Sequence, residues 1–269
     1  MDMTAPEADN QIDERYVVPG LLRGLQILQT FTRDRQEQTV ADMARLIGVT
    51  RSTAFRIVYT LEMAGFLRRA HDSRRYQLGG RVLELGYSFL AGKDLIEVAT
   101  PILRRLRDTT STSTHLAVRE GLEVVYVARF QGNTSLISAM TVGSRLPAHA
   151  TAPGRVLLAG LPLSEVVGLY EDFAFETFTP ETPDSMAALI SLVEKDRKDS
   201  TVISWGFYDA NVASIASPIY GATGKREAAV SISCPINTFD RATFETRIVR
   251  AVEGAAAEIS SGLGYRAAA

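Results

Sequence analysis

The sequence predicts an α+β protein: an N-terminal winged helix-turn-helix, a linker helix, and a C-terminal antiparallel sheet flanked by helices. Three observations support this. Apolar residues recur at helical spacing on both sides of a glycine turn in residues 39–65, a basic hairpin pattern follows in residues 66–78, and from residue 113 the period becomes that of strands. The expected boundaries are a disordered arm over 1–18, a winged helix-turn-helix over 19–80, a linker helix over 81–96 and a C-terminal domain over 97–269.

Two helices are expected before the glycine turn. The first should complete a small core with its apolar side chains. These are Leu21, Leu25, Ile27 and Leu28. Thr39 is a good N-cap with Asp42 three residues later, so the second helix should begin at Val40. Gly48 should end that helix, because glycine readily adopts a positive φ.

The third helix, capped by Thr50 or Ser52, presents a face typical of a DNA recognition helix. Such a helix contacts base edges with its N-terminal residues, where arginine can bind guanine and Thr53 or Phe55 a thymine methyl. Side chains further along the helix suit phosphate oxygens. The expected DNA contacts are Arg51, Ser52, Thr53, Phe55, Arg56, Tyr59 and Thr60. The alternative is a solvated face that happens to carry two arginines.

The hairpin of residues 66–78 adds weight to the DNA-binding interpretation. Its turn, residues 71–74, contains the turn formers Asp and Ser. A structural role can explain the arginines at positions 68 and 69, whereas Arg74 and Arg75 near the tip should contact phosphates. Residues 19–80 hold ten arginines and five acidic residues, a local charge of +5 in a chain of net charge −2.

Composition excludes several other kinds of site. Cys234 is the single cysteine, so the chain has no internal disulfide, and a buried strand thiol fits a reducing compartment. The three histidines are too widely separated for zinc spacing. No apolar run approaches the ~20 residues of a membrane span, and the acidic start is no signal peptide. We expect a cytoplasmic protein with no metal, cofactor or membrane partner.

Beyond the hairpin, residues 81–92 predict a linker helix that is more apolar than a free linker needs. It should therefore pack against another subunit or domain. Further helices are expected over 95–110, 154–161, 186–200 and 240–261. Strands are expected over 114–120, 123–130, 134–140, 212–220 and 227–235.

A ligand site is expected where residues 147–151 meet a helix N-terminus. Thr151 is a candidate N-cap and Pro153 lies in the first turn, and free amides at such a terminus attract an anion such as a carboxylate. His149 is either a partner of the ligand or a turn residue with its hydrogen bonds satisfied.

Serines on two expected strands point to the same site. The alternation of residues 227–234 places Ser231 and Ser233 on one face, and Ser214 lies on the preceding strand. Small hydroxyl side chains on a sheet face leave room for a small molecule and can orient it. The alternative is that these serines lie on a solvated face.

The function favoured by these patterns is a DNA-binding protein controlled by a small molecule. An enzyme fused to a DNA-binding domain, which regulates its own gene, is the main alternative. It needs a catalytic constellation in residues 97–269, and none is evident from the sequence. The segment GATGK lacks the spacing of a P-loop. A wing that binds protein rather than DNA is disfavoured by its arginines.

Several segments, in order, resemble the IclR family of bacterial transcription regulators. They are LLRGLQILQTF, STAFRIVYTLEMAGFL, RRYQLG, SRLPAHATAPGRVLLAGL and IASPIYGATGKREAAVSISCP. The resemblance covers about residues 19–262. It implies a GAF-like effector domain that binds a small metabolite, often a carboxylic acid, and dimers or tetramers on palindromic operators. AMTVGSRLPAHATAPGRVLLAGL is similar to regulators of protocatechuate and para-hydroxybenzoate breakdown, which implies an aromatic acid as effector.

The resemblance also implies a set of pocket residues. These are Met140, His149, Thr151, Ala152, Phe207, Ser214, Ser231 and Ser233. The chain departs from the family between Gly206 and Val212, where FYDAN is shorter and has Asp209 as its one acid. A wall of the pocket is therefore expected to be missing or rebuilt.

Overall fold

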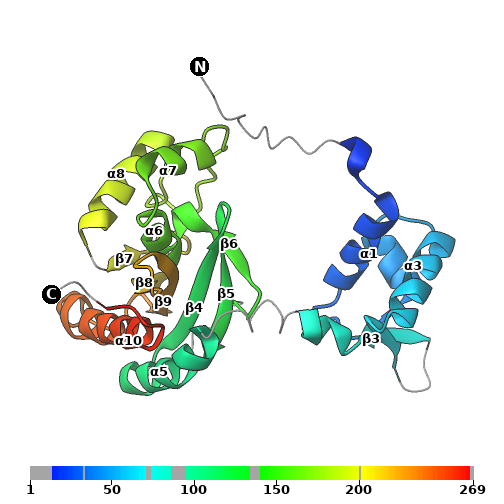
Figure 1. The fold of residues 1–269 in the computed structure, drawn as a ribbon, viewed down its shortest axis with the longest axis horizontal. Coiled ribbons are helices and arrows are strands. Elements are labelled where there is room, and N and C mark those ends of the chain that lie inside the picture. The colour runs from blue at the N-terminus through cyan, green and yellow to red at the C-terminus, as the bar shows by residue number, and fades with distance from the viewer. Residues whose placement is uncertain are drawn as a thin grey trace. The chain divides into compact units, whose positions relative to one another are not determined.

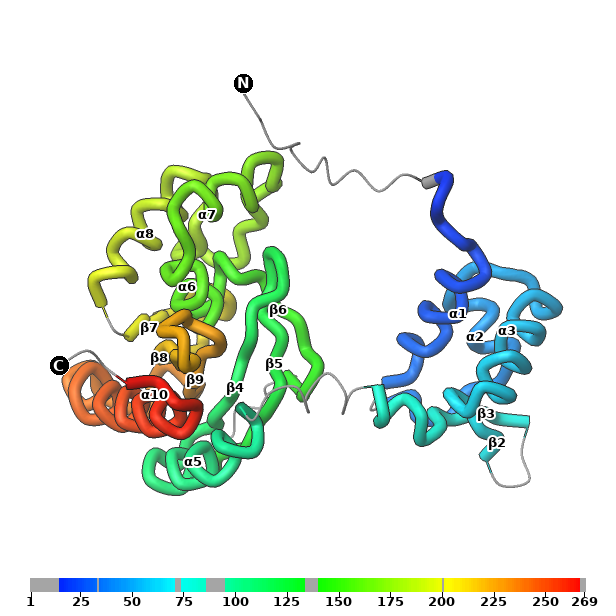
Figure 2. The backbone as a smooth tube through the Cα atoms, viewed as in Figure 1, coloured from blue at the N-terminus to red at the C-terminus, as the bar shows by residue number. Residues whose placement is uncertain are grey.

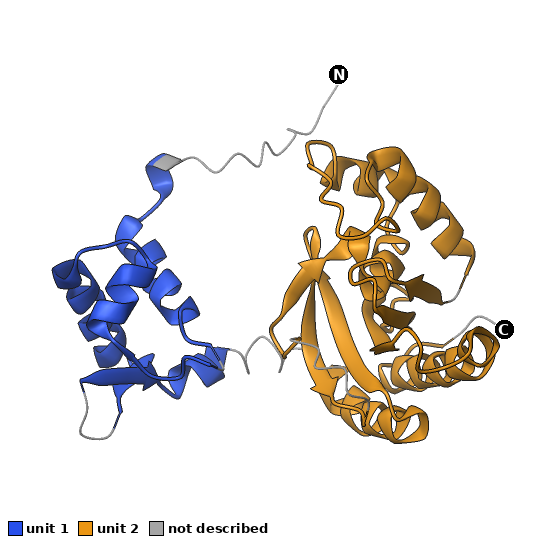
Figure 3. Ribbon diagram, turned by 180° about the vertical axis from the view of Figure 1, so that it is seen from behind, with its two compact units in different colours: residues 1–92 blue, residues 93–269 orange. Residues whose placement is uncertain are grey.

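The computed structural model describes residues 14–32, 34–70, 74–85, 95–133, 140–199 and 201–266. The chain divides into two compact units, residues 1–92 and residues 93–269 (Figure 3). Within the described ranges, no helix combines the length and the apolar content that crossing a membrane requires. Residues 14–16 of the expected N-terminal arm form a 3-10 helix, and residues 1–13 lie outside the described ranges.

The first unit has the predicted winged helix-turn-helix. Its elements are α1 (Pro19–Gln29), β1 (Gln38–Thr39), α2 (Val40–Leu46), α3 (Arg51–Met63), β2 (Leu67–Arg69) and β3 (Arg75–Leu78). The strands form a small antiparallel sheet in the order β1-β3-β2. The core consists of Ile27, Met43, Val58, Leu67 and Tyr76. Residues 81–85 are helical, residues 86–94 of the expected linker helix lie outside the described residues, and residues 95 and 96 belong to the next helix, Leu95–Thr110.

Local hydrogen bonds confirm the predicted helix starts. Thr39 Oγ1 accepts the Asp42 amide at 3.2 Å, and the Asp42 carboxylate accepts the Thr39 amide at 3.1 Å, which completes a capping box. Thr50, rather than Ser52, caps α3 by accepting the Thr53 amide at 3.2 Å. Gly48 has the expected positive φ of 68°.

The core expected of the first helix is partly wrong. Ile27 is fully buried and Leu28 is partly buried, but Leu21 and Leu25 are 63% and 50% exposed. The reason is geometric: α1 buries the face that carries Gly24 and Ile27, and the two leucines lie outside it. The helical spacing of apolar residues in α1 therefore includes side chains that this unit does not bury by itself.

The second unit is built on a six-stranded antiparallel sheet in the order β6-β5-β4-β9-β8-β7. The strands are β4 (Ser113–Glu120), β5 (Glu123–Phe130), β6 (Arg145–Pro147), β7 (Val202–Trp205), β8 (Val212–Tyr220) and β9 (Arg226–Pro235). The helices are α5 (Leu95–Thr110), α6 (Ala152–Leu158), α7 (Leu163–Leu169), α8 (Met186–Lys198), α9 (Arg241–Thr243) and α10 (Val249–Gly262). The α+β fold class is thereby confirmed.

The helices cover the two faces of this sheet. Helices α5 and α10 pack together on one face, and α6, with α7 and α8 outside it, covers the other (Figures 1 and 2). Adjacent residues of β8 show the alternation: Ala216 belongs to the core beneath α6, whereas Ser217 contacts Thr201, which in turn contacts Glu253 on α10. The main core lies between the sheet and α6 to α8.

Some elements differ from the sequence prediction. The short elements β6, β7 and α7 were not predicted, and α6 ends at Leu158 rather than at residue 161. The closing helix is interrupted by a π-helical turn, Phe244–Ile248. The strand expected over 134–140 falls outside the described residues except for Met140, which is not in a strand.

A buried ion pair joins α6 to α8. Arg155 donates from Nε and Nη2 to the two Asp196 carboxylate oxygens at 2.8 and 2.7 Å, and each side chain is 4% exposed. The guanidinium carbon lies 4.6 Å from the ring centroid of Phe207. This bidentate pair fixes both helices and the aromatic residue that follows β7.

We predict that Asp196→Ala lowers the free energy of unfolding by about 3–5 kcal/mol, because it leaves the Arg155 cation buried without a counter-ion. Urea denaturation followed by circular dichroism measures the change. Glu194→Ala, an exposed carboxylate on the same helix, is the matched control and should change stability by less than about 0.5 kcal/mol. Equal effects of the two substitutions would show that the pair is not a structural requirement.

Candidate nucleic-acid interface and ligand cavity

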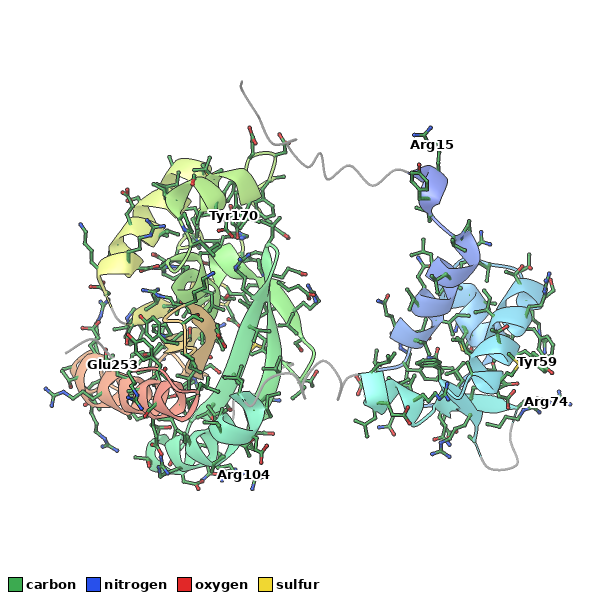
Figure 4. All side chains as sticks on the ribbon, in the orientation of Figure 1. Arg15, Tyr59, Arg74, Arg104, Tyr170 and Glu253 are labelled. Carbon is green, nitrogen blue, oxygen red and sulfur yellow. The ribbon has the colours of Figure 1, made fainter. Side chains whose placement is uncertain are left out.

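Helix α3 presents an exposed face on the first unit. Ala54 and Val58 are buried, while Phe55 and Tyr59 are 50% and 59% exposed, with ring centroids 6.4 Å apart. Arg51 lies beside them and is also exposed. Figure 4 shows Tyr59 on α3 and Arg74 beside β3 at the same edge of the unit. Two exposed rings flanked by arginines make a surface suited to a polyanion with apolar edges, such as DNA.

The remaining expected DNA contacts lie further round α3. Ser52, Arg56 and Thr60 are exposed and Thr53 is half-buried. Thr53, Arg56 and Thr60 also line a groove between α1 and α3. The structure thus places these three nearer to α1 than Arg51, Phe55 and Tyr59 are.

The arginines of the hairpin fall into two groups. Arg69 donates to Glu62 on α3 at 3.1 Å and lies 5.6 Å from the ring centroid of Tyr76, so it holds the hairpin against α3. Arg74 and Arg75 are exposed, and the turn at 71–73 lies outside the described residues. Arg69 therefore has the structural role that the sequence allowed, and Arg74 and Arg75 lie on the open surface.

Apolar side chains also remain uncovered on the first unit. Leu21 and Leu25 of α1 and Leu83 and Leu85 of the helical residues 81–85 are between 50% and 76% exposed. The groove between α1 and α3 has a volume of about 600 Å³, and Leu85 lines it. A patch of this kind on a small domain is typical of a protein–protein contact.

The second unit contains a cavity of about 480 Å³ on the α6 side of the sheet. The lining side chains that carry its chemistry are His115, Tyr126, Met140, Arg145, Thr151, Ala152, Ser204, Phe207, Tyr208, Asp209, Ser214, Ser231 and Ser233. The volume suits a ligand of metabolite size, and the polar groups are spread among apolar ones. Seven of the eight expected pocket residues line this cavity; the exception is His149.

His149 is placed elsewhere, which corrects its assignment to the pocket. Its ring is fully buried among aromatic rings of the segment that follows α7, at centroid distances of 5.2 to 6.3 Å. The rings belong to Tyr170, Phe173, Phe175 and Phe178. Nε2 lies 3.4 Å from the Glu176 carbonyl, and burial lowers the pKa of His149. The residue is part of the core.

The start of α6 offers less to an anion than the sequence suggests. Thr151 is the N-cap as predicted, and its Oγ1 accepts the Gly154 amide at 3.3 Å. Pro153 has no amide hydrogen, so within the first turn only the amide of Ala152 is left to a ligand. The helix is also only seven residues long. Other groups must therefore fix an acid in the cavity.

A row of serines supplies such groups. Ser204, Ser214 and Ser233 are cross-strand partners on β7, β8 and β9, and all three line the cavity. Ser233 Oγ is buried and has no hydrogen-bond partner among the described residues. Ser204 was missed from sequence because β7, only four residues long, was not recognised. The row presents hydroxyls that can bind an oxygen-rich ligand.

His115 also lines the cavity and was also missed. It is 1% exposed, lies on β4 opposite Ser231, and packs edge-on against Tyr126 with ring centroids 5.5 Å apart. Burial, reinforced by the charge of Arg129, lowers the pKa of His115 to about 3. The imidazole is therefore neutral at pH 7. The signal in the sequence is its inward position in the alternating segment THLAVRE.

The charged groups of the lining are already engaged. Arg145 donates to Glu123 at 2.6 Å and to Glu120 at 2.5 Å, and these hydrogen bonds raise the pKa of Arg145. The Asp209 carboxylate accepts the Asn211 amide at 2.9 Å. Hydroxyls and a neutral imidazole are left to contact a ligand in the interior.

The segment after Gly206 forms a wall of the cavity. The Gly206 amide donates to the Val212 carbonyl at 3.0 Å, which closes a tight connection between β7 and β8. Thr179 Oγ1 donates to the Gly206 carbonyl at 2.6 Å. Phe207 and Tyr208 then line the cavity, so the segment between Gly206 and Val212 forms part of its wall.

Comparisons with known proteins place these features in a family. A model described as "IclR helix-turn-helix domain" matches residues 20–71, and one described as "Bacterial transcriptional regulator IclR C-terminal" matches residues 87–261. The HTH-type transcriptional regulator XynR of Escherichia coli (strain K12) is 30% identical over 251 residues, which cover 93% of this chain and 99% of XynR.

Solved structures of IclR proteins are also similar to this chain. An IclR homolog from Microbacterium hydrocarbonoxydans, crystallised as a complex with 4-hydroxybenzoate, superposes with a TM-score of 0.79 at 30% identity, covering 91% of this chain and 98% of the other. The IclR protein of Thermotoga maritima gives a TM-score of 0.77 at 26% identity, with the same coverage.

Proposed function

Because the chain belongs to the IclR family of bacterial transcriptional regulators, we propose that it binds a palindromic operator in the cytoplasm and responds to a small organic acid. The observation that carries this proposal is the exposed face of α3 together with the basic hairpin on one unit, and a lined cavity on the other. An enzyme fused to a DNA-binding domain is not favoured, because a relative matched over nearly its whole length is named as a transcriptional regulator.

For the DNA contacts, we assign base readout to the N-terminal part of α3 and phosphate contacts to its far end and to the hairpin. Arg51 and Phe55 lie where a recognition helix enters the major groove, with Ser52, Thr53 and Arg56 beside them. Tyr59, Thr60, Arg74 and Arg75 then contact the backbone.

Two copies of the chain are proposed to occupy the operator. The uncovered leucines of α1 and of residues 81–85 are the surface that supports self-association as a dimer or tetramer. A dimer reads two half-sites about one helical turn apart, or a multiple of that spacing.

Arg51→Ala and Arg56→Ala should each weaken binding to the specific operator by about 1–3 kcal/mol, because each removes a base contact. Fluorescence anisotropy with the operator and with a scrambled duplex measures the loss of affinity and of specificity. Arg105→Ala, an exposed arginine on the second unit, is the control and should bind like the parent. Unchanged operator affinity and specificity in both α3 variants would remove α3 as the recognition helix.

Replacing Arg74 and Arg75 together by Ala should weaken specific and nonspecific duplexes about equally. Each lost phosphate contact should flatten the dependence of log K on log salt concentration by about one unit. Anisotropy titrations at several salt concentrations give the slope. An unchanged slope in the double variant would contradict a hairpin that contacts phosphates.

For the effector, we propose a small carboxylic acid, with aromatic acids as the preferred class. The cavity volume, its hydroxyl row and the aromatic wall at Phe207 support this class. The homolog crystallised with 4-hydroxybenzoate adds support from a relative that is 30% identical. Binding must differ between the DNA-competent and DNA-incompetent states, since otherwise the ligand shifts neither.

Ser231→Phe should abolish the ligand response and leave the operator affinity of the ligand-free protein intact, because the ring fills the cavity without touching α3. Calorimetry with 4-hydroxybenzoate, together with anisotropy on the operator, checks both halves. Ser164→Phe, at an exposed serine on α7, is the matched control. Ligand affinity retained in Ser231→Phe would place the effector outside this cavity.

A further inference from the structure

The described lining of the cavity has no uncompensated positive charge for the acid that we propose as effector. Arg145 is the one arginine in that lining, and the carboxylates of Glu120 and Glu123 hold its guanidinium. Asp209 adds a further negative charge. These four side chains carry one positive and three negative charges, a net charge of −2, which disfavours an anion. The serine hydroxyls can donate hydrogen bonds but carry no charge, so a favourable charge must come from beyond the lining.

Arg129 on β5 extends a row of side chains that reaches the cavity. It is the cross-strand partner of His115 on β4, and His115 is in turn the partner of Ser231 on β9. Side chains directly opposite each other on neighbouring antiparallel strands share one face of the sheet. Because His115 and Ser231 line the cavity, Arg129 is on the cavity face of the sheet, one strand beyond the lining.

Within the part of the chain that the structure describes, no carboxylate pairs with Arg129. The arginines of the two neighbouring strands differ in this respect: Arg119 of β4 contacts Glu165 at 3.8 Å, and Arg145 of β6 is held by two carboxylates. Arg129 is partly buried, and its Nε is enclosed without a hydrogen-bond partner among the described residues. A partly buried cation without a counter-ion is costly, and an anion nearby reduces that cost.

The charge of Arg129 acts inside the cavity. Burial lowers the pKa of the His115 ring to about 3, and the positive charge of Arg129 acts in the same direction, because it opposes a second positive charge on the ring. A charge that opposes a cation at His115 favours an anion at the same place. His115 is 1% exposed, so water screens this attraction less than it would at the surface.

We propose that Arg129 supplies the positive charge by which the cavity selects an acid over a neutral molecule of the same shape. This rests on the proposed function and deepens it, because it names the residue that makes the site specific for an anion. Arg129 acts through its charge from one strand beyond the lining, whereas the serine row supplies hydrogen bonds to the ligand. The preference for an acid should therefore depend on the charge at position 129 and little on the shape of the side chain there.

The test compares an acid with its neutral amide on the full-length protein. The probes are 4-hydroxybenzoate and 4-hydroxybenzamide, which have nearly the same shape and differ in charge. Isothermal titration calorimetry should show that the parent protein binds the acid more tightly than the amide. Arg129→Met should weaken binding of the acid by about five-fold or more and change the affinity for the amide by less than about two-fold, as expected for loss of a partly screened unit charge within about 10 Å.

Two further variants separate the charge of Arg129 from its shape and from its location. Arg129→Lys keeps the charge on a different head group and should retain the preference for the acid. Arg104→Met removes an exposed arginine of α5, whose guanidinium carbon lies 5.3 Å from the ring centroid of Phe130 (Figure 4). Phe130 follows Arg129 on β5 and so faces the other side of the sheet. The Arg104 variant should therefore bind both probes like the parent protein.

Two results would overturn the proposal. One is equal affinity of the parent protein for the acid and the amide. The other is equal weakening of both probes in Arg129→Met, because a merely structural role would change the cavity for either probe alike. Circular dichroism melting checks that each variant is folded, and Arg129→Gln, which is also uncharged, takes the place of Arg129→Met if that variant does not fold.

Operator anisotropy measured alongside separates this proposal from the broader one. If the acid binds with the expected dependence on Arg129 but leaves operator affinity unchanged, the role of Arg129 stands and the effector function falls. If neither probe binds while the operator does, the role of Arg129 in selecting an aromatic acid is overturned and the DNA-binding function stands.

Discussion

The buried ion pair between Arg155 and Asp196 joins α6 and α8 and lies against Phe207, which lines the cavity. Because the pair is buried, removing either partner leaves the other charge without water or a counter-ion, which strongly destabilises the fold. The Arg155 guanidinium also lies against Phe207, so one side chain fixes α6, α8 and an aromatic wall of the cavity. Gly154, beside it, allows α6 to begin in contact with the preceding turn, since a Cβ there would lie 2.2 Å from the Ala148 carbonyl oxygen.

Features encoded by neighbouring residues could be predicted from the sequence. The capping box of Thr39 and Asp42, the positive φ of Gly48 and the cap at Thr151 each depend on residues within three or four positions of one another. The same holds for the hairpin of β4 and β5, whose turn at Gly121 has a φ of 59°. Such signals fix the order of the elements, and hence the α+β class.

Features that depend on residues far apart in the sequence could not be predicted from it. Arg155 and Asp196 are 41 positions apart, and no pattern in either segment predicts that the two side chains pair. The aromatic residues that enclose His149 lie beyond α7, so the sequence could not show that its ring points away from the cavity. Ser204 and His115 join the site only through strand register, opposite Ser214 and Ser231. A local sequence pattern shows on which face of a helix or strand a residue lies. The pairing of strands decides which of these residues come together in the site.

The proposed regulation requires the effector and the operator to shift the same equilibrium between two states of the protein. An effector changes operator affinity only by its difference in affinity for the two states, which typically amounts to about 1–3 kcal/mol. The helical residues 81–85 follow the hairpin directly, and Leu85 lines the groove whose other side carries Arg56 and Thr60. A displacement of this helix therefore changes the surroundings of residues assigned to DNA. Because the same helical residues expose Leu83 and Leu85, the proposed self-association and the proposed DNA contacts would involve one element, and a ligand that biased one would bias the other.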